Sequence, residues 1–338
     1  MRAPRNVMVT CGGNWVGMVW HLRQAIDAVR ALRGGAVVVA DMAGPSPGGL
    51  FAGRQVVVPP IADPGYVPAL LEACRENDVR VLVPIIDLDL NRLAPHRVEF
   101  EAVGTTVVSP PPELCELCFD KLLFQRFAEV EGLNPPRAYG PEEIGTAAYP
   151  LFYKRRLGYG SIGTGVASSP EAVRHALAAG PDLLVQEVVD APEASVDAYV
   201  APSGRCTVRV QRLRTRVVGG EAWRSVTVRC APLGEVADRA ICALARRGLR
   251  GPLNVQVFVS DPPRIGEVNP RLGSASVFSN LACRGRLFRS VLAGACGEDV
   301  DGDPDDYRVG LQLRRFLGDV YYDGETVLGV VPGGEAGW

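Results

Sequence analysis

Short apolar runs alternate with longer helical segments along the first 110 residues, and this alternation restricts the fold more than any other feature of the sequence. The runs are four to six residues long and cover residues 6–10, 36–40, 55–58, 79–84 and 105–108. Strands separated by helices predict parallel βαβ units, in which ligands gather at the carboxyl ends of the strands. Gly12, Gly13, Asp41 and Asp87 lie at such ends.

The pattern changes at residue 110, where three consecutive prolines interrupt the chain. Helical runs follow, then a strand, a glycine-rich loop and several runs that alternate with period two, which is typical of an α+β region. We therefore expect α/β and α+β architecture in one chain. The pattern divides the chain into an α/β domain that ends at about residue 110 and an α+β region that follows it.

Composition excludes several classes of protein. Apolar residues make up 47% and charged residues 22% of the chain, as in ordinary globular proteins. No stretch of apolar residues is long enough to span a membrane, and the net charge of −2 gives no general attraction to nucleic acid or anionic lipid. The nine cysteines are scattered and odd in number, and the N-terminus lacks a secretion signal, so we expect reduced thiols and a cytoplasmic protein.

Lysine is almost absent, and its two positions are informative. Of the 36 basic residues only Lys121 and Lys154 are lysines. Lys154 lies on the strand that leads into the glycine-rich loop 158–163, whose sequence is GYGSIG. A dinucleotide fingerprint needs a helix that begins directly at the loop, but after this loop no helix is predicted until Pro170. The loop is therefore typical of a flap over nucleotide phosphates. An ordinary mobile hairpin is the alternative.

A second group of polar residues lies on the predicted strand 264–269. Glu267 and Asn269 share one face of this strand, and their oxygens suit Mg²⁺. Gln256 lies on the preceding strand, on the same face as Asn254. Arg271 follows where it could meet a phosphoryl oxygen. The alternative is a solvated sheet face with a single acid.

Residues that could select a substrate lie elsewhere. Arg212, Arg214 and Arg216 alternate along one predicted strand, so that three guanidinium groups would share a face and attract a substrate carboxylate or phosphate. Acidic side chains or water could balance them instead. Asp87 lies at a strand end beside the expected cleft, and Ser274 follows the predicted metal strand closely.

Taken in order, these motifs resemble the ATP-grasp superfamily, in the branch of carbamoyl phosphate synthetase and the stand-alone carboxylate–amine ligases. Asp120-Lys121 resembles the start of the family's central region, and residues 149–163 resemble its phosphate loop. Residues 185–193 resemble the adenine and ribose segment, and residues 254–271 the metal-binding end. Arg155 stands where the family usually has proline, and residues 190–192 lack its common glycine.

The resemblance implies a Rossmann-like pre-ATP-grasp domain (1–110) followed by a two-lobed ATP-grasp fold, with ATP and Mg²⁺, or Mn²⁺ in its place, as cofactors. The implied parts after the first domain are a helical connection (111–148), a lid subdomain with the glycine loop (149–200) and a C-terminal subdomain with the metal site (201–338). It implies catalytic roles for Arg271 and Lys154. It implies that the nucleotide is bound by Lys121, Lys154, Gly160, Ser161, Gly163, Gln186, Glu187 and Glu193. It implies metal ligation by Gln256, Glu267 and Asn269. Arg212, Arg214, Asp87 and Ser274 remain the candidate substrate contacts.

The implied reaction joins a small-molecule carboxylate to an amine, of amino acid type, through an acyl phosphate, with release of ADP and phosphate. No nucleic acid or membrane partner is expected, and a homodimer is one expectation because the family is often dimeric. Three alternatives stay open. They are a kinase or carboxylase on the same scaffold, a degenerate nucleotide-binding protein, and a Rossmann-type NAD(P)-dependent oxidoreductase that would use Gly12, Gly13, Gly17 and Asp41.

Overall fold

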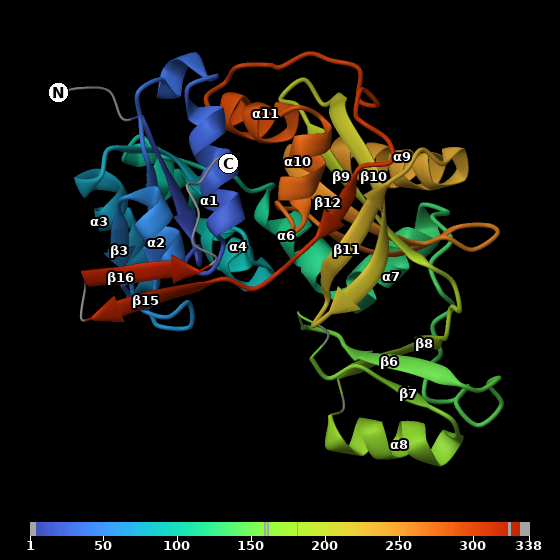
Figure 1. Cartoon of the computed structure of the whole chain (residues 1–338). Helices are drawn as coiled ribbons and strands as arrows, with labels where there is room; N and C mark the ends of the chain where they lie inside the picture. The colour runs from blue at the N-terminus through green and yellow to red at the C-terminus, as the bar shows by residue number, and fades with distance from the viewer. Residues whose placement is uncertain (1–4, 159, 161, 181, 324–325, 332–338) are drawn as a thin grey trace.

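A computed structural model describes residues 5–158, 160, 162–180, 182–323 and 326–331. Figure 1 shows an N-terminal α/β domain beside a lobe built on a larger sheet, with a small lid of three strands and one helix projecting from that lobe. The site described below lies where these three parts meet.

The N-terminal domain is a parallel sheet with strand order β3-β2-β1-β4-β5. Its central strands are buried almost throughout, as expected where helices cover both faces of a parallel sheet. The strands are β1 (Asn6–Thr10), β2 (Val37–Asp41), β3 (Gln55–Val57), β4 (Val79–Val83) and β5 (Thr106–Val107). The helices are α1 (Val16–Ile26), α2 (Pro47–Ala52), α3 (Tyr66–Glu76), α4 (Asp87–Leu93) and α5 (Arg97–Ala102), with 3-10 turns at Arg30–Leu32 and Ala94–His96.

Two helices connect this domain to the lid. They are α6 (Pro112–Phe119) and α7 (Lys121–Val130), and the side chain of Asp120 caps the second by accepting bonds from Leu122 N and Leu123 N. The lid is an antiparallel sheet of order β7-β6-β8 with one helix. Its elements are β6 (Leu151–Arg155), β7 (Gly165–Ala167), α8 (Pro170–Ala179) and β8 (Leu183–Glu187).

The C-terminal lobe is a sheet of order β13-β12-β9-β10-β11-β14, antiparallel throughout. Its strands are β9 (Glu193–Val200), β10 (Cys206–Val218), β11 (Glu221–Thr227), β12 (Gly251–Phe258), β13 (Arg264–Asn269) and β14 (Gln312–Arg314). The helices are α9 (Ala231–Arg246), α10 (Ser276–Ala282) and α11 (Arg286–Ala295), and the chain continues into the hairpin β15 (Asp319–Asp323) and β16 (Thr326–Val331).

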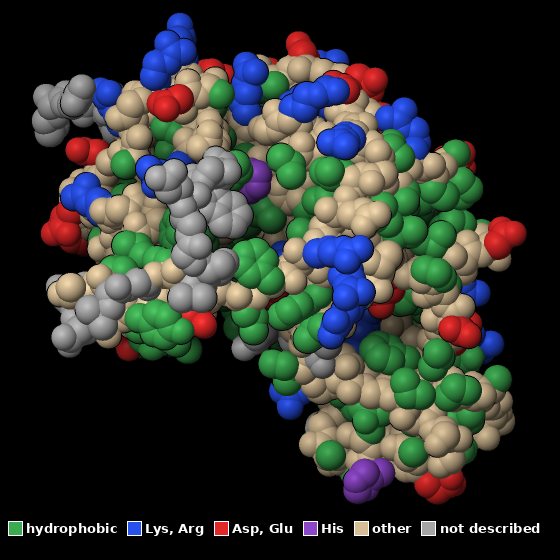
Figure 2. Space-filling model, in the orientation of Figure 1, with side chains coloured by type: hydrophobic (Ala, Val, Ile, Leu, Met, Phe, Trp, Pro, Cys, Tyr) green, Lys and Arg blue, Asp and Glu red, His purple; other side chains and the backbone are tan. Residues whose placement is uncertain are grey.

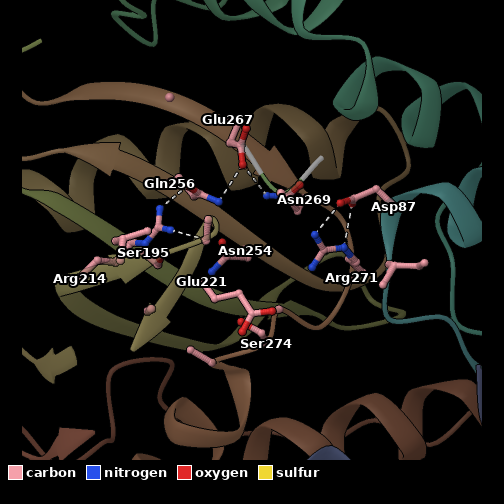
Figure 3. Close-up of a pocket in the computed structure, with 18 of the residues that line it drawn as sticks. Asp87, Ser195, Arg214, Glu221, Asn254, Gln256, Glu267, Asn269, Arg271 and Ser274 are labelled. Atoms are coloured by element: carbon pink, nitrogen blue, oxygen red, sulfur yellow. Dashed lines mark hydrogen bonds and ion pairs between the residues drawn. The ribbon is translucent and has the colours of Figure 1, made fainter. Parts of the chain in front are cut away.

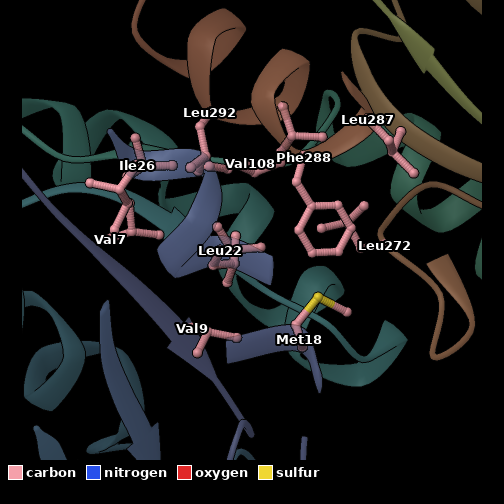
Figure 4. Packing of buried hydrophobic residues seen from close by; sticks show 14 of the residues in the cluster. Val7, Val9, Met18, Leu22, Ile26, Val108, Leu272, Leu287, Phe288 and Leu292 are labelled. Atoms are coloured by element: carbon pink, nitrogen blue, oxygen red, sulfur yellow. The ribbon is translucent and has the colours of Figure 1, made fainter. Parts of the chain in front are cut away.

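One hydrophobic core joins the N-terminal domain to the C-terminal lobe. Figure 4 shows Met18 and Leu22 of α1 close to Phe288 and Leu292 of α11, with Val9 of β1 beneath them. All five side chains are buried. The two parts therefore share one core, which holds the site between them in a fixed geometry.

The elements differ from the sequence-based expectations in several places. The periodicity over residues 281–294 predicts a single helix, but this segment spans parts of two helices, because Arg284 and Gly285 have positive φ angles of 55° and 81° that a right-handed helix cannot contain. Strand β9, expected within the lid (149–200), pairs with β10 and β12 of the large sheet. Strand β11 and helix α2 have no counterpart among the predicted elements.

Three arginines form an exposed row across neighbouring strands. Arg216 pairs with Arg224 across β10 and β11, and Arg224 pairs with Arg314 across β11 and β14. None of the three forms an ion pair with a described carboxylate. Figure 2 shows basic side chains gathered over β10 and β11 on this face. This row, called the arginine ladder below, is a local concentration of like charge.

All nine cysteines are free, as the sequence suggested. Within the described ranges the structure also contains no helix with the length and hydropathy of a membrane span.

Candidate active site

A cavity of about 410 Å³ lies between the lid, the large sheet and the carboxyl end of the N-terminal sheet. Most of the predicted site residues line it: Lys121, Lys154, Gly160, Glu193, Gln256, Glu267, Asn269, Arg271, Arg212, Arg214, Asp87 and Ser274. The fold therefore brings together residues that are separated by up to about 190 positions in the chain.

The two lysines enter the cavity from different elements. Lys121 is the first residue of α7, and its Nζ donates to Gly158 O in the glycine loop at 2.6 Å. Asp120 fixes this helix start, because its carboxylate caps the helix and also accepts from Arg156 Nε at 2.7 Å. Burial would raise the pKa of Asp120, but Arg156 and the two capping N–H groups lower it below its ordinary value. Asp120 thus links the start of α7, where Lys121 lies, to Arg156 directly after the lid strand β6.

Lys154 and Glu267 form the electrostatic centre of the cavity. Burial lowers the pKa of the Lys154 ammonium, and Glu267 partly opposes this. Burial alone would raise the pKa of Glu267, but the ammonium groups of Lys154 and Lys121 outweigh it and hold this pKa below its ordinary value. Glu267 is therefore an anion in a strongly positive environment at neutral pH.

The glycine loop has the backbone that its sequence requires. Gly160 and Gly163 have positive φ angles of 62° and 73°, a region that residues with a Cβ rarely enter. A Cβ at Gly163 would also approach Arg155 Nε to 2.7 Å. Of the three residues predicted to close over phosphates, Gly160 lines the cavity, Gly163 does not, and Ser161 lies outside the described residues.

The predicted adenine residues lie beside the cavity and do not line it. Gln186 is buried and donates to Gln125 Oε1 at 2.7 Å. Glu187 Oε1 accepts from Arg137 N at 2.7 Å and pairs with Arg264 of β13. In this geometry both side chains join the lid to neighbouring segments.

The predicted metal residues meet at Glu267. Gln256 Nε2 donates to Glu267 Oε1 at 2.7 Å, and Asn269 Nδ2 donates to the same oxygen at 3.1 Å. Arg214 Nη1 lies 2.6 Å from Gln256 Oε1 and 2.6 Å from Glu193 Oε2. Figure 3 shows this chain of contacts, with the Gln256 amide between the guanidinium and the carboxylate.

Arg271 and Asp87 pair with each other across the boundary between the domains. Arg271 Nε donates to Asp87 Oδ1 at 2.8 Å and Nη2 to Oδ2 at 2.5 Å, a bidentate pair between the end of β13 and the start of α4. Asp87, expected as a substrate contact, and Arg271, expected at the phosphoryl group, thus form one unit that faces the cavity (Figure 3).

The expected row of three guanidinium groups on β10 is reduced to two in the cavity. Register shifts occur on both sides of Arg216 in its pairing with β11, and Arg216 is exposed outside the cavity. Arg212 is only 3% exposed, and its Nε donates to Asp197 Oδ2 at 2.8 Å. Its Nη1 is buried without a hydrogen-bond partner among the described residues.

Asp197 is the anionic partner that fixes the position of the Arg212 guanidinium. Its other oxygen, Oδ1, accepts from Asn254 Nδ2 at 2.6 Å, and Ser279 Oγ donates to Oδ2, the oxygen that also accepts from Arg212. Asn254, which shares a strand face with Gln256, thus supports this buried network.

Comparison with known proteins identifies the domains of this chain. The model of the ATP-grasp domain matches residues 118–275, and the model of the PylC-like N-terminal domain matches residues 16–108. The chain carries an ATP-grasp domain. The expected fold class, a Rossmann-like domain followed by an ATP-grasp fold, is confirmed, and so is an enzyme of the ATP-dependent ligase kind.

Solved structures resemble this ATP-grasp chain over nearly its whole length, at low identity. The biotin carboxylase domain of 2-oxoglutarate carboxylase from Hydrogenobacter thermophilus, in complex with MgADP, ADP and bicarbonate, has a TM-score of 0.75 and 13% identity, covering 92% of this chain and 74% of that one. L-amino acid ligase from Bacillus licheniformis has a TM-score of 0.69 and 18% identity, covering 91% and 78%. N5-carboxyaminoimidazole synthetase from Staphylococcus aureus, complexed with ADP, has a TM-score of 0.71 and 14% identity, covering 90% and 80%. No curated protein sequence matches the chain. The ADP and Mg complexes agree with the expected cofactors, ATP and Mg²⁺.

Sequence reasoning missed one side of the ATP-grasp cavity. Glu221 of β11 lines it and pairs with Arg315 at 2.7 Å, and Arg315 Nη2 also donates to Ser274 O. Trp15 and Ile85 of the N-terminal domain form an apolar wall here. No local signal could identify these residues, because Glu221 and Arg315 are 94 positions apart and meet only when β14 pairs with β11.

The residues of the oxidoreductase alternative have other partners in this ATP-grasp chain. Asp41 Oδ2 accepts from Gly13 N at 2.7 Å, and Oδ1 accepts from Met42 N at 2.8 Å. A Cβ at Gly13 would lie 2.6 Å from Asp41 Oδ2, so a larger residue there would push this carboxylate away from its bond to the loop. Asp41 therefore fixes the loop that contains Gly13.

Proposed function

We propose that the enzyme joins a small carboxylic acid to an amine, of amino acid type, with ATP and Mg²⁺. A carboxylate oxygen would attack the γ-phosphorus of ATP, the bond to ADP would break, and an acyl phosphate would form. The amine nitrogen would then attack the acyl carbon, phosphate would leave, and the nitrogen would lose a proton.

One observation carries this proposal more than any other. A single cavity contains a positive centre, where Lys121 and Lys154 face Glu267, and is also lined by Arg212, whose buried Nη1 has no hydrogen-bond partner among the described residues. The lysine centre suits nucleotide phosphates, and the Arg212 guanidinium suits an organic carboxylate. A buried donor without an acceptor is costly, which a bound carboxylate would relieve.

The donors fit a magnesium nucleotide. Glu267 offers a carboxylate, and rotation of the Asn269 amide would turn its oxygen toward an ion beside that carboxylate. Mg²⁺ supplies charge neutralisation between the phosphates when bound. Lys154 and Lys121 would hold the phosphate oxygens, and Glu193 the ribose hydroxyls. Arg271, oriented by Asp87, would face the transferred phosphoryl group.

The apolar wall suggests the kind of substrate. Trp15, Met18, Ile85, Ile86 and Leu88 line the end of the cavity nearest the N-terminal domain. We therefore propose that at least one substrate carries an apolar group that packs there. We also propose that the protein is cytoplasmic, that its thiols are reduced and that it forms a homodimer.

The test is ADP release by the purified protein with pairs of amino acids, and with bicarbonate as the acid in a parallel series. We expect release that needs both an organic acid and an amine. Release with bicarbonate alone would favour the carboxylase alternative, and release without any amine would favour a kinase.

Lys154→Arg tests the phosphate role with the charge kept. The planar guanidinium cannot replace a compact ammonium in a closed site, so we expect kcat/KM for ATP to fall at least about tenfold. Arg174→Lys, an exposed change on the same lid outside the cavity, is the matched control and should leave the rate unchanged. Equal rates for the two variants would contradict the assignment of Lys154.

A further inference from the structure

The cavity contains four described carboxylates, and they are not equivalent. They belong to Asp87, Glu193, Glu221 and Glu267. The first three form ion pairs with an arginine: Arg271 at 2.5 Å, Arg214 at 2.6 Å and Arg315 at 2.7 Å. Glu267 alone among the four has no arginine or lysine nitrogen within 4 Å in the described part of the chain. Only one carboxylate is therefore available to a metal ion.

The amide of Gln256 separates this carboxylate from a fixed cation. Its Nε2 faces Glu267 and its Oε1 accepts from Arg214 Nη1 at 2.6 Å. Arg214 is held in that position by Glu193 and by Gly220 O, to which its Nη2 donates at 2.6 Å. A cation on the Arg214 side of Gln256 would lie beside this guanidinium without an anionic ligand of its own.

We propose that this site takes one divalent ion per bound nucleotide, held by Glu267 and Asn269, and that Arg214 supplies the positive charge that a second ion would bring. The inference rests on the proposed nucleotide function, and it changes the expected role of two residues. Gln256 acts as a link between Arg214 and Glu267, with its oxygen turned to the guanidinium. Arg214 serves the nucleotide end of the cavity, and Arg212 remains the contact for the acid.

Manganese counting tests this without a ligase assay. The protein is kept in excess over a non-hydrolysable ATP analogue, and bound Mn²⁺ is counted by the EPR signal of the free ion. We expect one ion per nucleotide for the wild type. The double variant Arg214→Gln/Gln256→Glu removes the guanidinium and adds a carboxylate, and we expect two. Arg216→Gln, which removes an exposed arginine from the same strand, is the control and should retain one.

Each outcome has a distinct meaning. Two ions in the wild type would overturn the inference and leave the proposed ligase untouched. One ion in a double variant that still binds the nucleotide and melts like the wild type would overturn the role of Arg214. One ion in the wild type and two in the double variant, with no ligation of any acid and amine, would support the inference and count against the ligase reaction alone.

Discussion

At the scale of single residues, the N-terminal domain contains a buried acid with no part in the proposed reaction. Asp89 is fully buried in α4, where Tyr66 OH donates to Oδ1 at 2.7 Å and Thr10 Oγ1 donates to Oδ2. Burial raises its pKa from 3.8 to about 6, although the two hydroxyl bonds oppose this. The folded protein therefore binds this proton more tightly than the unfolded chain does.

The sign of the resulting pH dependence follows from linkage. Because the pKa of Asp89 is higher in the folded state, its contribution to the free energy of unfolding is complete below pH 3.8 and is lost as the pH rises to about 6. We expect the wild type to lose about 3 kcal/mol relative to Asp89→Asn across this interval. Urea unfolding of both proteins at pH 4, 5, 6 and 7 measures the difference.

Comparing the wild type with Asp89→Asn cancels the contributions of other titrating groups to the free energy of unfolding. Burial lowers the pKa of His21 to about 4, which acts in the opposite direction over the same interval, but both proteins contain His21. Parallel stability profiles for wild type and Asp89→Asn would show that the carboxyl group titrates alike in the folded and unfolded states.

At the scale of elements, the arginine ladder opposes the pairing of β10, β11 and β14. Arg224 lies between Arg216 and Arg314 in the register of the three strands. Like charges directly opposite each other weaken a sheet by about 0.2–1 kcal/mol per pair. We expect Arg224→Thr to raise the free energy of unfolding by roughly 0.5–1 kcal/mol at low salt, because it relieves both contacts.

Salt and a charge-preserving change test this explanation. The gain should shrink in 1 M NaCl, where charges are screened within about 3 Å. Arg224→Lys keeps the charge and should give no gain. A gain for Arg224→Thr that salt does not reduce would instead reflect the strand preference of threonine.

At the scale of the whole molecule, the N-terminal domain and the C-terminal lobe share their hydrophobic core. Phe288 is fully buried in α11 against residues of α1, and its ring also meets that of His21 at 5.6 Å between centroids. We expect Phe288→Ala to lower the free energy of unfolding by about 3–5 kcal/mol. Circular dichroism and tryptophan fluorescence should report one common urea transition in both proteins.

The contrary result is a separation of the two signals. If the N-terminal domain and the lobe unfold at different urea concentrations in the wild type, the shared core does not couple them. The cavity between them would then open by local unfolding, and nucleotide affinity would follow the less stable part.

The sequence alone determined the elements whose pattern is local. Strand β13 (Arg264–Asn269) has the bounds that the periodicity predicts, and helix α8 (Pro170–Ala179) begins at Pro170 as expected, because period and capping act over a few residues. The motif order also indicated the ATP-grasp domain that the family models match. Lys121, Lys154 and Glu267 were found as candidate site residues because each lies in a short motif.

Only the tertiary structure decided how those residues are partnered. The pair Arg271–Asp87 joins positions 184 apart, and Arg214 reaches Gln256 across strands that are not neighbours along the chain. Register shifts moved Arg216 out of the cavity, and a positive φ at Gly285 divided one expected helix into two. Such contacts depend on how packed elements meet, and a local pattern contains no information about that. The sequence thus determined which chemical groups the site contains, and the packing of three separate parts decided which of them are neutralised and which remain available to a ligand.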